Sequence, residues 1–276
     1  MRRVSPGIVS ILMVCLVATW PQIVHAQSGS GKVKPIWSGT SGGYTIQWTE
    51  KDLSVRAKPL DTRPRISART LVLKDVDAET TREAEFDIKL LSVVGPILSF
   101  EVHAYVDGGG AHPMLATYYQ VVDATHPART VALTGLFPDA QVLKALLADK
   151  IIQKVLATDG AQAPPTTCIE LVKRLNGKEF GGESDSEYGF GPDFLTEFAF
   201  HHIEGDMVAV RLSVSHGAEV YRGEHTQIGI LLPIPTLLQH PFELARARKE
   251  GFLMQDAIKL FKDNQTKIEF SPPKKP

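Results

Sequence analysis

The sequence predicts an α+β fold with a largely antiparallel sheet and packed helices. Apolar and polar residues alternate in two pairs of segments typical of β-hairpins, at 86–106 and 194–214, and in a further strand at 226–232. Apolar residues recur with helical spacing in two other regions, 138–175 and 242–263. Because strands and helices occupy separate runs of the chain instead of alternating, an antiparallel sheet is favoured over a parallel one.

The first 26 residues have the pattern of a cleavable secretory signal peptide. Two arginines precede an uncharged apolar run at 7–20, and Val24 and Ala26 supply the small residues of a cleavage site. An uncleaved membrane anchor is the alternative, but the run is shorter than the roughly 20 apolar residues that a transmembrane helix requires. We therefore expect cleavage before Gln27, a periplasmic or secreted location, and no membrane span after cleavage.

The segments after residue 26 differ in composition. Residues 27–43 are rich in Gly and Ser, which predicts a flexible leader. Strand patterns over 44–113, interrupted by a basic, proline-containing loop at 57–69, predict an N-terminal subdomain of strands. An α+β domain is expected over 114–265, and residues 266–276, which end in SPPKKP, are expected to form a disordered tail.

Two helices are expected in the middle of the chain. Pro138 at a first-turn position opens the clearest one, which should continue to residue 157. A shorter helix begins at Thr167, which has capping-box spacing to Glu170. Cys168 shares the apolar face of this second helix, so a buried and unreactive thiol is predicted.

Charge, cysteine content and motifs exclude several classes of protein. Without the two signal arginines the chain has 28 basic and 31 acidic residues, a net charge of −3, which gives no basic surface for nucleic acid. A single remaining cysteine excludes an internal disulfide. The chain contains no Gly-x-Ser-x-Gly elbow, P-loop or dinucleotide fingerprint, so the sequence assigns no catalytic residue and no cofactor.

A glycine-rich turn carries the first group of potential metal ligands. His103 and Asp107 share one face of a strand and His112 follows the turn, and imidazole and carboxylate groups suit a transition metal. We favour the alternative that the glycines supply positive φ and that His112 bonds to the backbone, so no metal site is predicted. The residues of this turn motif are Gly108, Gly109, Gly110 and His112.

A second group of histidines lies in the hairpin at 194–214. His201 and His202 adjoin Glu204, and His216 follows further along the chain. Neighbouring residues of a strand point to opposite faces, so the two adjacent histidines are not expected to join one site. His202 is expected on the core side with a satisfied polar partner.

The insert at 181–194 is acidic and aromatic, which suits either a solvated loop or a contact surface for a basic partner. In the second interpretation the carboxylates attract the partner and the rings anchor it. The predicted partner-binding residues are Glu183, Asp185, Glu187, Tyr188 and Phe190.

Three stretches together resemble the RsiV-type exported domain, which occurs in anti-sigma factors and beside a peptidoglycan deacetylase domain. They are the strand and turn SFEVHAYVDGGGAHP at 99–113, the Leu-Phe step into a helix at 134–157, and the closing strands at 194–238. The insert at 176–193 departs from the family pattern. The resemblance implies an α+β binding module without catalytic residues, and a lysozyme-like or other cationic envelope protein as its partner.

The sequence therefore predicts an exported, extracytoplasmic binding module that recognises a protein or wall component. The alternative is a cell-envelope hydrolase acting on peptidoglycan or another wall polymer. A hydrolase should gather titratable groups in one concave site, whereas a binding module should present a loop or a sheet face.

Overall fold

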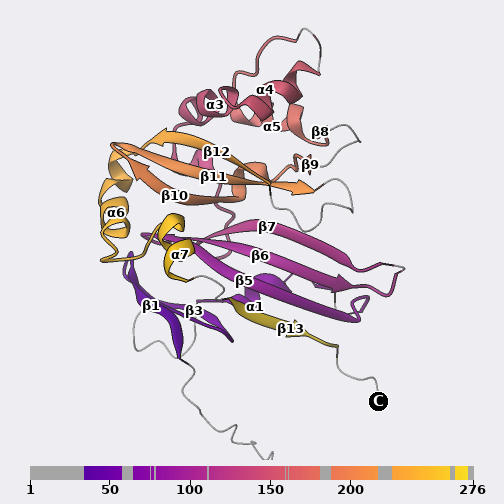
Figure 1. Ribbon diagram of the computed structural model, residues 1–276, viewed down its shortest axis with the longest axis vertical. Coiled ribbons are helices and arrows are strands. Elements are labelled where there is room, and N and C mark those ends of the chain that lie inside the picture. Colours follow the sequence, from indigo (N-terminus) through magenta and orange to yellow (C-terminus); the bar gives the residue numbers. More distant parts are fainter. Residues whose placement is uncertain are drawn as a thin grey trace, which may run out of the picture. The chain divides into compact units, whose positions relative to one another are not determined.

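The computed structural model describes residues 34–272, apart from 58–64, 75, 78, 111, 159, 161, 181–187, 217–225 and 262–264. Within these residues the chain forms three antiparallel sheets with helices packed against them, which confirms the predicted α+β class (Figure 1). The predicted signal peptide and the first part of the predicted leader lie outside the described residues.

A four-stranded sheet has the order β13-β5-β6-β7. Its strands β5 (Glu83–Val94) and β6 (Ile97–Asp107) form the predicted hairpin, which turns at Gly95 with a φ of 56° that glycine adopts without strain. All ten residues of β7 (Met114–Asp123) pair with β6. The domain boundary expected between 113 and 114 is therefore wrong, since it falls inside one sheet.

The fourth strand, β13 (Thr266–Phe270), corrects the expectation of a disordered tail from residue 266. It pairs antiparallel with the outer edge of β5, with Ile268 opposite Phe86. Thr266 and Ile268 are buried while Lys267 and Glu269 are exposed, as in a half-buried edge strand. Alternation over only five residues, shortly before two prolines, is a weak signal, so composition alone favoured a tail.

A smaller sheet of β1, β2, β3 and β4 is built from the N-terminal part of the described chain. The predicted leader is wrong from Pro35 onward and the predicted loop is wrong from Ile66 onward, because both regions contribute strands. Ser67 then caps helix α1, its Oγ accepting the Thr70 backbone N–H at 3.1 Å. The elements are β1 (Pro35–Ser41), β2 (Tyr44–Thr49), β3 (Leu53–Arg56), β4 (Ile66–Ser67) and α1 (Ala68–Leu73).

The third sheet contains the second predicted hairpin and the predicted last strand of that region. β10 and β11 are joined through Gly205, whose φ is 62°, and β12 pairs with the other side of β11. Two short strands extend the sheet beside the end of β11. The elements are β8 (Glu179–Phe180), β9 (Tyr188–Gly189), η1 (Phe194–Thr196), β10 (Phe198–Glu204), β11 (Met207–His216) and β12 (Thr226–Pro233).

The helix predicted over 138–157 is two helices, preceded by the short α2 (Leu133–Leu136). The chain leaves helical geometry at Asp149, whose Oδ1 accepts the backbone N–H groups of Ile151 and Ile152 at 2.8 and 3.1 Å and so starts a new helix. The Thr167 cap of the next helix is confirmed. The elements are α3 (Asp139–Leu147), α4 (Lys150–Ala157) and α5 (Cys168–Leu175).

Two further helices follow β12. Helix α6 (Thr236–Arg246) starts earlier than the predicted 242 because it continues through Pro241, and α7 (Met254–Leu260) is shorter than the predicted 252–263. Pro241 has no backbone N–H, so it removes one hydrogen-bond donor from inside the helix.

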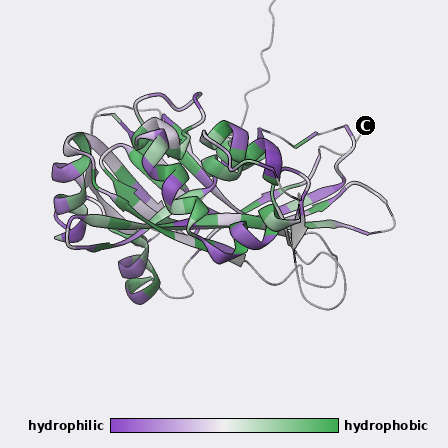
Figure 2. Ribbon diagram, turned by 90° about the horizontal axis from the view of Figure 1, so that it is seen from above, coloured by the Kyte–Doolittle hydropathy of each residue, from purple (hydrophilic) through white to green (hydrophobic). Residues whose placement is uncertain are grey.

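Two apolar cores lie between the packed layers of the molecule. One lies between helices α2–α6 and one face of the β10-β11-β12 sheet, and the other lies between the β13-β5-β6-β7 sheet and the small N-terminal sheet. A third cluster, Leu91, Tyr119, Ala199 and Met254, joins the facing sides of the two larger sheets. In Figure 2 the inner strands carry long hydrophobic stretches, and hydrophilic residues are frequent on the outer helices and turns.

Candidate functional site

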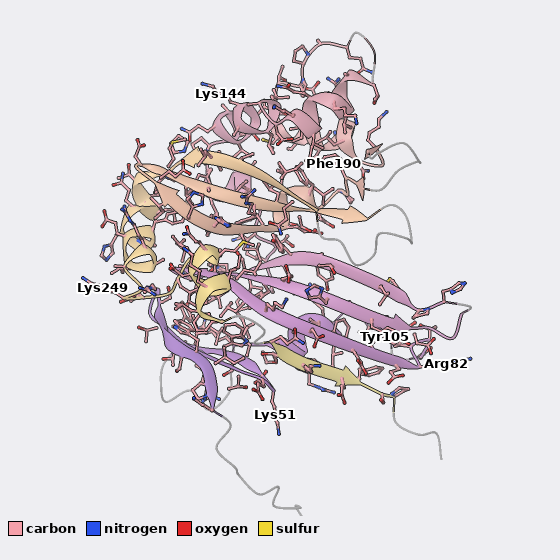
Figure 3. All side chains as sticks on the ribbon, in the orientation of Figure 1. Lys51, Arg82, Tyr105, Lys144, Phe190 and Lys249 are labelled. Carbon is pink, nitrogen blue, oxygen red and sulfur yellow. The ribbon has the colours of Figure 1, made fainter. Side chains whose placement is uncertain are left out.

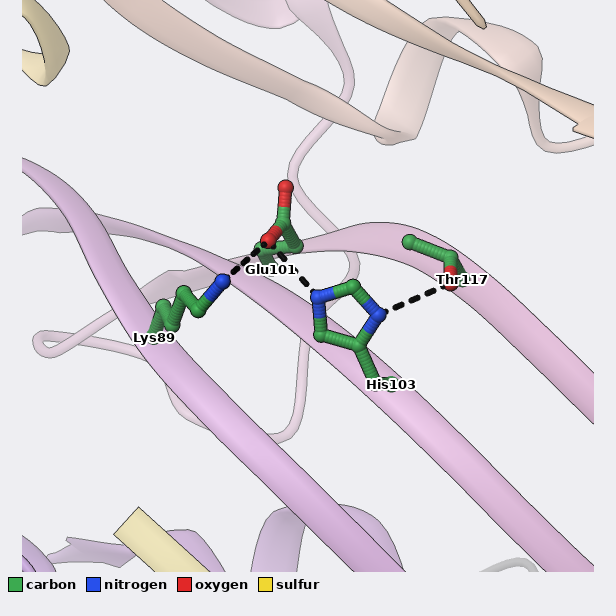
Figure 4. A network of polar contacts seen from close by, with 4 residues as sticks. All are labelled: Lys89, Glu101, His103 and Thr117. Carbon is green, nitrogen blue, oxygen red and sulfur yellow. Dashed lines mark hydrogen bonds and ion pairs between the residues drawn. The ribbon is translucent and has the colours of Figure 1, made fainter. Parts of the chain in front are cut away.

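A polar network lies on the face of the β5-β6-β7 sheet that looks away from the small N-terminal sheet (Figure 4). Glu101 Oε1 lies 2.8 Å from His103 Nε2 and 3.4 Å from Lys89 Nζ, and His103 Nδ1 lies 2.9 Å from Thr117 Oγ1. Both nitrogens of His103 are therefore engaged, Nε2 by Glu101 of the same strand and Nδ1 by Thr117 of the neighbouring strand β7. This arrangement holds the imidazole in place as a link between β6 and β7. The polar partners of both ring nitrogens are therefore protein side chains.

The predicted glycine-rich turn connects β6 to β7. Gly109 has a φ of 77°, and its N–H donates to Asp107 Oδ1 at 2.7 Å. Positive φ falls on Gly109 alone within Gly108–Gly110, so the glycine requirement is confirmed for one position of the three. A Cβ added to Gly109 would lie 2.5 Å from Arg82 Nε, whereas one added to Gly108 would meet nothing within 4 Å. His112 is exposed at the end of this turn.

The two adjacent histidines do meet, which corrects the expectation that they point to opposite faces. A β-bulge between Phe200 and His202 shifts the register of β10, and it brings His201 Nδ1 within 2.7 Å of His202 Nδ1. His202 Nε2 lies 2.7 Å from Glu204 Oε1. Burial lowers the pKa of His201, and the charges of Arg211, His202 and Lys259 lower it further.

A groove of about 500 Å³ runs along the outer edge of β7. Five consecutive residues of β7, 118–122, line it, so side chains from both faces of the strand border the same space. One lip comes from β4 and α1, the other lip comes from η1 and the residues on either side of it, and the loop at 127–130 also contributes to the wall. The charged residues of its wall are Arg65, Lys74, Arg129, Asp193 and Glu197.

Glu197 is a titratable group of this wall whose environment is unusual. It follows η1 directly, and its backbone carbonyl accepts the Ser213 N–H at 2.9 Å. Burial raises the pKa of its carboxyl to about 7; a second hydrogen bond, from the Ser213 side chain to the carboxyl, opposes the rise, and the negative charge of Asp193 adds to it. Burial also raises the pKa of Tyr119, on the same stretch of β7, well above its usual range. Glu197 therefore changes charge near neutral pH.

The predicted contact loop is only partly described. Glu183, Asp185 and Glu187 lie outside the described residues, and Tyr188 begins β9. The expectation of an exposed ring at Phe190 is wrong, because Phe190 is 2% exposed and packs edge-on against Phe194 with ring centroids 5.1 Å apart. Figure 3 labels it close to the helical layer, and labels Tyr105 and Arg82 at the far end of the β5–β6 hairpin.

Family models, curated proteins and solved structures gave no match. The resemblance to the RsiV-type domain therefore stays a prediction. Among the described residues no helix is long and apolar enough to cross a membrane, and no three His, Cys, Asp or Glu side chains are grouped so that they could hold a metal ion.

The predicted thiol chemistry agrees with the structure. Cys168 is fully buried, and burial together with its contact to Asp139 raises the pKa of its thiol to about 12. A thiol that stays protonated at neutral pH is a poor nucleophile, so Cys168 is a core residue.

Sequence reasoning missed the groove. Its cations are contributed by three separate regions, at residues 65, 74 and 129, and none of them stands in a local motif. One signal was present in the sequence: the strand at 114–122 contains no charged residue, which is unusual for a strand that proves to lie at a sheet edge.

Proposed function

We propose that this chain is an exported, extracytoplasmic binding module whose ligand occupies the β7 groove. The groove supports this proposal because it combines residues of the β7 edge, apolar side chains and three cations in one space of a size typical of binding sites. Its charged residues are spread along two lips, as suits recognition of an extended ligand.

The test compares capture of partners by the full chain and by two charge-reversed variants. The groove variant carries Arg65→Glu and Arg129→Glu, and the control carries Arg246→Glu and Lys249→Glu, two exposed residues at and just beyond the end of α6. Each immobilised protein is incubated with the periplasmic and extracellular extract of its native organism. We expect species that bind the parent and the control but not the groove variant. Equal capture by all three, or no capture, contradicts the proposal.

A lysozyme-like or other cationic partner stays a prediction of the family resemblance. Three of its five expected contact residues lie outside the described residues, and a fourth, Phe190, is buried. Surface plasmon resonance against lysozyme at two salt concentrations tests it, because attraction between exposed charges weakens as salt screens them. The groove proposal does not depend on that result.

One observation favours a hydrolase as the second candidate. A carboxyl whose pKa lies near 7 in a groove is the kind of group that acts as a general acid, and Asp193 supplies a second carboxylate in the same wall. Release of soluble fragments from purified peptidoglycan by the parent, abolished in Glu197→Gln and Asp193→Asn, would support hydrolysis. Binding without release supports the binding module.

A further inference from the structure

The face of the β13-β5-β6-β7 sheet that carries His103 is covered at one end only. At that end Leu91 and Tyr119 pack against Ala199 and Met254. Toward the other end, where Figure 3 labels Tyr105, the side chains reach solvent, and Leu115 is 45% exposed. We call this uncovered part the outer sheet face. Strand alternation and register place six side chains on it: Glu83, Glu85, Tyr105, Asp107, Leu115 and Glu269.

Carboxylates stand directly opposite each other on the outer sheet face. Glu83 of β5 pairs with Asp107 of β6, and Glu85 of β5 pairs with Glu269 of β13. Like charges in directly opposed positions destabilise a sheet. None of these four carboxylates forms an ion pair with a Lys, Arg or His side chain within the described part of the chain. Their mutual repulsion is therefore not compensated by the fold itself.

Carboxylates nearer the covered end of the same face do have cationic partners. Glu101 Oε1 lies 3.4 Å from Lys89 Nζ, and Asp87 Oδ1 lies 3.9 Å from Lys267 Nζ. The charges are thus balanced close to the neighbouring layer, and acidic charge is in excess where the face is open. Sequences that keep an unfavourable arrangement of this kind usually do so at functional sites. The contrast indicates that the outer sheet face receives its cations from another molecule.

A concavity of about 280 Å³ lies on the outer sheet face. Glu85 and Asp87 border it from β5, and Tyr105 and Leu115 border it from β6 and β7. A carboxylate wall therefore stands beside an aromatic and aliphatic wall. Lysine and arginine side chains match this combination, because a long apolar stem ends in a cation. The space is smaller than the roughly 300–1,000 Å³ of small-molecule pockets, so it suits side chains of a partner better than a whole small ligand.

We propose that the outer sheet face docks an extended basic segment of a partner protein, with lysine or arginine at every second position. Side chains on one face of a strand repeat about every 6.8 Å, so such a segment places successive cations beside Glu83, Glu85 and Asp87. A second copy of this chain fits poorly, because it would bring the same carboxylates together. The proposal goes beyond the proposed function, since this concavity and the β7 groove share no lining residue.

The probe is a fluorescent octapeptide of alternating Lys and Thr, and a block peptide with four Lys before four Thr has the same charge. Fluorescence polarisation with the full chain at low salt should show about fivefold weaker binding of the block peptide, because half of its cations point away from the sheet. The Glu85→Gln, Glu269→Gln variant should bind the alternating peptide about fivefold more weakly than the parent. The control Asp206→Asn, Glu243→Gln removes the same charge at exposed positions elsewhere and should bind like the parent.

Two further measurements separate docking from a structural role. Leu115→Ser should weaken binding of the alternating peptide about threefold, because the lysine stems lose an apolar contact. Met114→Ser is its control and should bind like the parent, since Met114 is 57% exposed but points to the opposite face of β7. In urea denaturation the Glu85→Gln, Glu269→Gln variant should have a midpoint equal to or above that of the parent, because it removes two opposed like charges.

Several outcomes would overturn this proposal. Equal binding of the alternating and block peptides, or equal binding by the charge variant and its control, would do so. A lower urea midpoint in the charge variant would show that these carboxylates stabilise the sheet, which removes the argument from opposed charges. Spermine that displaces the peptide, together with no effect of Leu115→Ser, would assign the face to small polycations instead. Capture by the β7 groove is measured with different variants, so either proposal can fail while the other stands.

Discussion

The stability of this protein should depend on pH through Glu197, and replacing Glu197 by Gln should remove that dependence. The pKa of the carboxyl rises from its ordinary value of 4.5 to about 7 in the folded chain, chiefly through burial. Below pH 4.5 both folded and unfolded chains carry the proton. Between pH 4.5 and 7 the unfolded chain has released it and the folded chain retains it, so the free energy of unfolding falls as pH rises.

The size of the effect follows from the two pKa values. Each pKa unit corresponds to 1.36 kcal/mol, so this carboxyl destabilises the folded chain at pH 8.5 by up to about 3 kcal/mol relative to pH 4.5. The partial exposure of Glu197 makes this an upper value. Gln keeps the shape and an acceptor oxygen for Ser213 but has no proton to release. Glu197→Gln should therefore match the parent at pH 4.5 and exceed it at pH 8.5.

Urea denaturation of the parent and of Glu197→Gln at pH 4.5, 6, 7 and 8.5 measures this difference. The matched control is Glu243→Gln, a substitution of an exposed glutamate on α6, which should follow the parent curve. If the difference between parent and Glu197→Gln stays constant with pH, burial does not raise the pKa of this carboxyl and the reasoning fails.

Three further predictions concern other parts of the molecule. Gly109→Val should lower the free energy of unfolding by about 1–2 kcal/mol because its φ is 77°, whereas Gly108→Val should change it by less than about 0.5 kcal/mol; urea melts that rank them in the opposite order would contradict the turn geometry. Ile268→Ala should cost about 2–4 kcal/mol, because Ile268 is 4% exposed in β13, and a loss comparable to that of the exposed Lys267→Ala would mean that β13 is not paired. His201 has a lowered pKa, so below about pH 6.5 the unfolded chain takes up a proton that the folded chain resists; the stability advantage of the parent over His201→Gln should therefore shrink as pH falls below 6.5, and an advantage that grows would show a raised pKa.

Local patterns in the sequence predicted the parts of the fold that depend on local physics. The β5–β6 and β10–β11 hairpins have strict alternation and glycine turns, and the Thr167 cap has its partner three residues away. Each of these features is settled by residues close together in the chain. The fold class followed from their order.

The features that sequence reasoning got wrong depend on contacts between distant residues or on small irregularities. β13 is stabilised by β5, far earlier in the chain, and a bulge in β10 brings the side chains of His201 and His202 together. The groove required knowing that β7 is an edge strand, which only the sheet order reveals. Phe190 sits beside acidic residues in the sequence but is covered by the helical layer.

The pairing of β13 with β5 also governs the order in which the chain can fold. The strand that completes the edge of the β13-β5-β6-β7 sheet is the last element of the described chain, and its partner is among the earlier ones. Contacts of such long sequence separation form slowly, because the loop between them must close first. Until residues 266–270 have emerged from the ribosome, β5 presents an open edge, so this side of the nascent sheet can recruit a foreign strand. A chaperone that shields β5 during synthesis would therefore raise the yield of folded protein.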